Sequence, residues 1–141
     1  MRSRVGQFVI PQKLPLETVA IVEATAPDVQ ERRAAIIFRA WHHLPTEQAR
    51  RLLFEQFTLD GNVVGLLDAI VATVRQGRWL GLAPTSLAPL QRADRDWLDP
   101  TLEGALIRAI KEVLDASVSV LNAWREAFRF FMGQLTPAPH V

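Results

Sequence analysis

The sequence predicts an all-α protein, a small helical bundle of about four to six helices with a long C-terminal helix as its spine. Residues 99–135 read as one unbroken amphipathic helix, and earlier segments show apolar stripes at helical spacing between turn and capping residues. With 141 residues, the chain is long enough to bury about 68% of its unfolded surface as one domain. It therefore needs no metal or disulfide to fold.

The domain is expected to span residues 16–135, between an N-terminal arm of residues 1–15 and a frayed tail of residues 136–141. The arm carries three basic residues and no acidic one, and such a segment can become ordered on a partner. Residues 16–24 follow a proline and have apolar residues at Leu16 and Val19, which favours a short helix.

Capping and turn residues divide the middle of the chain into further helices. Residues 25–28, Thr-Ala-Pro-Asp, resemble a capping box and predict a helix that runs to about His43. Pro45 forces a break, after which Thr46 caps a helix to about Phe57. A turn at residues 60–62 precedes an apolar stripe over residues 63–74 that ends at Gly77, a natural C-cap. Residues 78–98 are read as irregular, around one short helix at residues 89–95.

The C-terminal third has the features of one long helix. Asp99 suits an N-cap and Pro100 the first helical position, and no further proline occurs before residue 136. Apolar residues share a face of roughly 200° when projected at about 100° per residue. An eleven-residue repeat keeps this face in phase, as is typical of a nearly straight helix. Its members include Leu102, Val113, Trp124 and Leu135.

Such a helix is too long for the domain that carries it. It would extend about 52 Å, whereas a globule of this length is roughly 37 Å across, so about 15 Å would overhang. The overhang would expose aromatic side chains that need a partner. The predicted partner-binding residues are therefore Trp124, Phe128, Phe131 and Met132, together with Trp79, which lies between two glycines. The alternative is a bend near Ser117 and Ser119, because serine pairs can kink helices.

Motifs for catalysis and for cofactor binding are missing from the sequence. There is no cysteine, adjacent His42 and His43 point about 100° apart on a helix, and His140 lies in the tail. We therefore expect no metal site, no cofactor and no enzymatic activity. The acids Asp68 and Glu103 are the best-buried candidates by pattern, and we expect both to be structural, Glu103 in a helix first turn.

A set of arginines supports a nucleic-acid alternative. Arg50, Arg51, Arg75 and Arg78 would contact a phosphate backbone, within a chain whose net charge is only +1. Residues 28–60 also hold five acids, so surface ion pairs account for most of these charges. In size and helicity the chain is similar to the small subunits of CRISPR-type effectors, which implies a ribonucleoprotein subunit.

The sequence thus favours a non-enzymatic helical subunit that joins a larger complex or a homo-oligomer by docking through its long C-terminal helix. Its partner would be another protein or a second copy. The alternatives are the nucleic-acid-binding subunit above and a sensor of apolar ligands held between helices. No stretch is apolar enough to span a membrane, and the cytoplasm is the default location.

Overall fold

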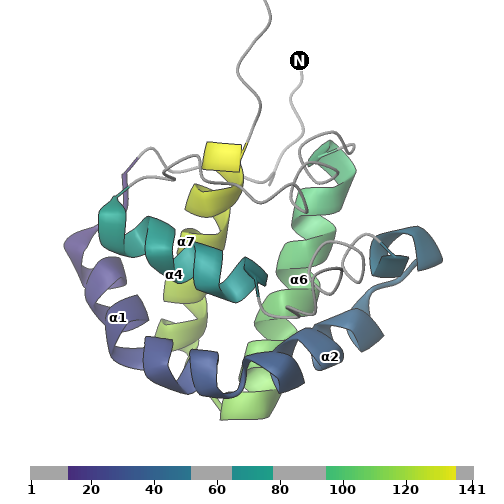
Figure 1. The fold of residues 1–141 in the computed structure, drawn as a ribbon, viewed down its shortest axis with the longest axis horizontal. Coiled ribbons are helices and arrows are strands. Elements are labelled where there is room, and N and C mark those ends of the chain that lie inside the picture. Colours follow the sequence, from purple (N-terminus) through teal and green to yellow (C-terminus); the bar gives the residue numbers. More distant parts are fainter. Residues whose placement is uncertain (1–12, 52–64, 78–94, 136–141) are drawn as a thin grey trace, which may run out of the picture.

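The computed structural model describes residues 13–51, 65–77 and 95–135, which form helices joined by short connections (Figure 1). These ranges contain no strand, so the predicted all-α class is confirmed. A further helix begins at Glu47. The other helices are α1 (Leu16–Glu31), α2 (Arg33–His43), α4 (Gly65–Gln76), α6 (Arg95–Leu114) and α7 (Val118–Leu135). Of the segment predicted to be irregular, residues 78–98, residues 78–94 lie outside the described residues, and residues 95–98 are helical, because α6 begins at Arg95. The arm up to residue 12, the tail, the end of the helix predicted to about Phe57 and the turn at residues 60–62 also lie outside the described residues.

The bundle is built around a hairpin of α6 and α7. The two helices meet at the bottom of Figure 1 and pack against each other along the molecule. On one side α1 and α4 cover α7, and on the other side α2 packs chiefly against α6. The first two helices therefore divide between the two arms of the hairpin.

The single helix predicted over residues 99–135 is wrong, and the alternative of a break near Ser117 is right. Asp115 has φ 53°, in the left-handed region, which ends α6 and turns the chain. The Ser117 side-chain hydroxyl then accepts a hydrogen bond from the backbone N–H of Val120 at 3.3 Å and caps α7. Both helices face one core, so the apolar phase continues although the helix axis does not.

The start of this region also differs from the prediction. α6 begins at Arg95, so Asp99 is not its N-cap and Pro100 lies in its second turn. A proline at this position removes a single backbone hydrogen bond, which a twenty-residue helix tolerates. Glu103 is consequently a mid-helix residue and not part of a first turn.

The predicted helix start at residues 25–28 is wrong as well. α1 continues through Pro27 to Glu31, and the break falls at Arg32. The Thr25 hydroxyl donates to the backbone oxygen of Ile21 at 2.8 Å and caps nothing. Burial explains this result. Val22 precedes Pro27 and Val29 follows it, and because both side chains are buried, the helical turns before and after the proline stay packed on the core.

Other local predictions are confirmed. Thr46 caps the helix that begins at Glu47, where its hydroxyl accepts from the Ala49 backbone N–H at 3.1 Å. Gly77, with φ 76°, follows the last residue of α4. The predicted stripe of α4 is buried from Leu66 to Val74.

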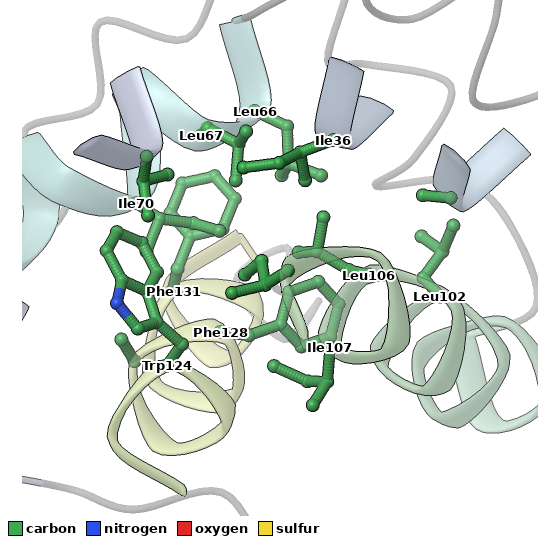
Figure 2. Packing of buried hydrophobic residues seen from close by; sticks show 14 of the residues in the cluster. Ile36, Leu66, Leu67, Ile70, Leu102, Leu106, Ile107, Trp124, Phe128 and Phe131 are labelled. Carbon is green, nitrogen blue, oxygen red and sulfur yellow. The ribbon is translucent and has the colours of Figure 1, made fainter. Parts of the chain in front are cut away.

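One apolar core joins all the helices (Figure 2). Aromatic side chains of α7 fill its centre, where they meet aliphatic side chains of α2, α4 and α6. The largest fully buried members are Trp124, Phe128, Phe131, Ile36, Leu44, Leu66, Leu67 and Ile70. The wide apolar face of residues 99–135 is thus covered by other helices of this chain. The predicted overhang is wrong.

The left-handed residue between α6 and α7 provides a test of the hairpin. Because alanine is strained at positive φ and glycine is not, we expect Asp115→Ala to be less stable than Asp115→Gly by about 1 kcal/mol. In an unbroken helix the order is reversed, since alanine is favoured over glycine there by about 1 kcal/mol. Urea unfolding of both variants measures the difference, and a more stable alanine variant would contradict the hairpin.

Candidate functional site

The residues predicted to bind a partner on the C-terminal helix lie in the interior. Trp124 is 1% exposed, and Phe128, Phe131 and Met132 are fully buried. The indole Nε1 of Trp124 donates a hydrogen bond to the Thr25 hydroxyl of α1 at 2.8 Å. The partner role was inferred from an exposed overhang, and these side chains are instead covered by α1, α4 and α6. The remaining predicted residue, Trp79, lies outside the described residues.

The predicted arginine set is not gathered in one place. Arg75 of α4 pairs with Glu23 of α1, with 3.2 Å between its Nε and the carboxylate. Arg50 and Arg51 belong to the helical residues 47–51 that follow α2. This segment lies at the opposite side of the bundle from the start of α1 (Figure 1). Arg78 lies outside the described residues. Of the three members that the structure describes, it therefore brings together only Arg50 and Arg51.

These two arginines lie beside a group of aromatic side chains, which we call the aromatic–arginine surface: Phe38, Trp41, His42, Arg50 and Arg51. The rings of Phe38 and His42 meet edge to face with centroids 4.5 Å apart, and those of Trp41 and His42 do so at 5.1 Å. The Arg50 guanidinium lies over the Trp41 ring, 5.4 Å from its centroid. Phe38 is 63% exposed. The surface thus presents contiguous aromatic and cationic groups, the composition found at protein interfaces.

Next to these rings the surface is hollowed. The hollow has a volume of about 370 Å³ and is lined by Trp41, Glu47, Arg50 and Arg51. Arg50 is held in place by a hydrogen bond from its Nε to the backbone oxygen of Leu44 at 3.2 Å. One wall is therefore an indole and the others are charged groups.

Sequence reasoning missed Phe38, although the sequence holds a signal for it. Projected at about 100° per residue, Phe38 lies about 150° from the centre of the apolar stripe formed by Ile36, Ile37 and Ala40. A large aromatic side chain opposite the buried face of a helix has no place in the core. Such a position is the sequence pattern that indicates an exposed contact residue.

A second polar feature, the Glu112 cluster, fastens α2 to α6. The Glu112 carboxylate accepts a hydrogen bond from His43 at 2.7 Å, and it lies 3.3 Å from Arg39 and 3.6 Å from Arg108. The hydrogen bond from His43 is the main cause of the lowered pKa of Glu112, to which the nearby charges of Arg39 and Arg108 add. The cluster holds the helix that carries Phe38 and Trp41 against the core.

The two acids that the sequence marked as candidates, Asp68 and Glu103, have structural partners. Glu103 is nearly buried and binds Arg129 through two hydrogen bonds, one of them at 3.0 Å, with Arg125 at 3.7 Å. These contacts raise the pKa of the Arg129 guanidinium. Asp68 accepts from the Gln30 amide at 3.1 Å, not from Arg75. No group of three metal-ligating side chains occurs in the part of the chain that the structure describes.

Comparisons with known proteins add no family. No protein-family model and no curated protein sequence matches this chain. Among the described helices, none is long and apolar enough to cross a membrane. The surface chemistry of the described residues is therefore the guide to function.

A matched pair of phenylalanines tests which residues build the core. We expect Phe128→Ala to lower the free energy of unfolding by about 3–5 kcal/mol, because it opens a cavity among fully buried side chains. Phe38→Ala makes the same chemical change at an exposed position and should shift stability by no more than about 0.5 kcal/mol. Urea denaturation followed by circular dichroism measures both. Similar losses in the two variants would contradict this assignment of core and surface.

The pH dependence of stability tests the Glu112 cluster. Because the pKa of Glu112 is lowered from its ordinary value of 4.5 in the folded state, its stabilisation is present above pH 4.5. It is lost as the pH falls through the lowered pKa. We expect Glu112→Gln to melt below the wild type near neutral pH, and the gap to close below pH 4.5.

The control for this experiment is Glu31→Gln, which removes an exposed carboxylate at the end of α1. All other carboxylates titrate equally in each pair of proteins and cancel in the difference. A gap for Glu112→Gln that is independent of pH down to acid unfolding would contradict a role for the ionised carboxylate.

Proposed function

We propose that this protein is a non-enzymatic interaction subunit that binds a protein partner through the aromatic–arginine surface. The observation that carries the proposal is the exposure of Phe38, 63%, at the end of a row of contacting groups. The Phe38 ring meets the His42 ring, the His42 ring meets the Trp41 ring, and the Arg50 guanidinium lies over Trp41. Aromatic and arginine side chains are enriched in binding hot spots, which pack around such anchors. Docking through one long C-terminal helix is not part of this proposal, because α6 and α7 form the core.

The size of the surface favours a different protein over a second copy. The exposed side of α2 is about 16 Å long for eleven residues and about 10 Å wide. Pairing α2 with α2 would bury roughly 160 Å² on each copy, whereas stable interfaces bury about 800 Å² on each partner. A segment of a different protein that also enters the hollow beside Trp41 would bury more surface than a pair of α2 helices.

Charge favours a protein over a nucleic acid. The hollow contains the Glu47 carboxylate, which repels phosphate, and Arg39 is already paired with Glu112. Arg75, the third described member of the predicted phosphate-binding set, is paired with Glu23. The non-enzymatic part of the proposal is supported by Glu103, the one nearly buried carboxylate among the described residues, because its oxygens are engaged by Arg125 and Arg129 in a contact between α6 and α7.

The test is the effect of Phe38 on binding. The tagged wild type, Phe38→Ala and Val118→Ala are used to capture partners from native extract, and the protein recovered is then purified and titrated calorimetrically. We expect Phe38→Ala to raise the dissociation constant at least tenfold, which is a loss of about 1.4 kcal/mol of binding free energy. Val118→Ala is the control, because Val118 is 72% exposed at the start of α7.

Three results would overturn the proposal. One is equal affinity of Phe38→Ala and the wild type for the purified partner. Another is recovery of nucleic acid whose affinity falls steeply with salt, which is the signature of phosphate contacts. The third is a wild-type dimer in light scattering that Phe38→Ala converts to a monomer, which would identify a second copy as the partner.

A further inference from the structure

We propose that the hollow beside Trp41 receives a carboxylate of the partner, presented by an acidic segment that also carries apolar side chains. This inference rests on the proposed function and specifies the partner's chemistry. It starts from a cavity of about 370 Å³ whose described lining consists of two guanidinium groups, one indole and one carboxylate. The described lining thus has one more positive than negative charge.

The arginine geometry leaves hydrogen-bond donors for a ligand. Arg50 uses its Nε for the Leu44 backbone oxygen, and this bond together with the contact to Trp41 fixes the plane of its guanidinium. Its terminal amino groups make no hydrogen bond with the described residues. Arg51 is exposed and makes no hydrogen bond or ion pair with them either. A preorganised guanidinium binds a carboxylate through two parallel hydrogen bonds, with less loss of side-chain freedom than a lysine.

The surroundings select for apolar groups next to that carboxylate. Trp41 is half-buried and forms one wall of the hollow, and the edge-to-face rings of His42 and Phe38 continue outward from it. A peptide whose acidic residue enters the hollow would place its neighbouring side chains on these rings. The expected ligand is therefore an extended or helical segment in which Asp or Glu alternates with Leu or Phe.

Glu47 distinguishes a carboxylate from a phosphate. Its own negative charge lines the hollow and opposes any anion, and a phosphate dianion is opposed more than a carboxylate monoanion. A purely structural role of Glu47 would not predict that its substitution increases affinity, whereas a carboxylate site does. Removal of this charge must strengthen the binding of an acidic peptide.

The experiment uses the full chain and a fluorescently labelled ten-residue peptide that alternates Asp and Glu with Leu and Phe. Fluorescence anisotropy measures its affinity, and the matched peptide has Asn and Gln at the acidic positions. We expect Arg51→Gln to lower the affinity for the acidic peptide at least tenfold and Arg51→Lys to lower it less. Glu47→Gln should raise this affinity severalfold. Arg32→Gln, an exposed arginine at the other end of α2, should leave the affinity unchanged. Circular dichroism checks that each variant is folded.

The outcomes separate this inference from the function on which it rests. Equal binding of the acidic and amide peptides, or no effect of both Arg51→Gln and Glu47→Gln, overturns the carboxylate site. The proposed function is retained in that case if Phe38→Ala still abolishes binding of the natural partner. If a single-stranded oligonucleotide competes with the peptide and itself loses affinity in Arg51→Gln, the hollow is a phosphate site and the inference is overturned.

Discussion

Three residues, 115–117, return the chain on itself, so the apolar faces of α6 and α7 lie against one core and not along one rod. This reversal determines where the other helices pack. α1 and α4 find their apolar surface on α7, and α2 finds its surface chiefly on α6. With both arms of the hairpin covered in this way, α2 turns Phe38 away from the core and towards solvent.

Much of the fold follows from local patterns in the sequence. The stripe of α4, the cap at Thr46 and the C-cap at Gly77 each depend on a few neighbouring residues, and they were predicted correctly. The errors have two physical causes. Prolines near capping residues were taken as helix starts at residues 25–28 and 99–100, whereas both helices run through them. In addition, periodicity reports which side chains face the core and not whether a helix axis continues. Two successive helices on one core keep the same phase, so the break at Asp115 was hidden. Tertiary burial likewise carried α1 through Pro27.

The candidate surface was predicted only in part. Arg50 and Arg51 were singled out as a pair, and the structure adds the hollow and the Trp41 indole beside them. Trp124 and Phe128 were assigned to a partner because an incorrect helix length left them uncovered, and they are central to the core. Which side chain covers another is a long-range property that one sequence does not reveal. Phe38 was accessible to prediction, because it departs from the stripe of its own helix.

The Thr25–Trp124 hydrogen bond joins residues 99 positions apart, and the Thr18–Glu126 bond joins residues 108 apart. α1 therefore leaves the ribosome about a hundred residues before the helix that covers it. Closing so long a loop is entropically costly, and contacts of this kind slow folding. Until α7 is made, the side of α1 that packs on α7 has no cover, although α2 and α4 can already contact α1. Apolar surface exposed in this way during folding favours aggregation. Synthesis of the C-terminal hairpin is thus the step that completes the folding of the N-terminal half.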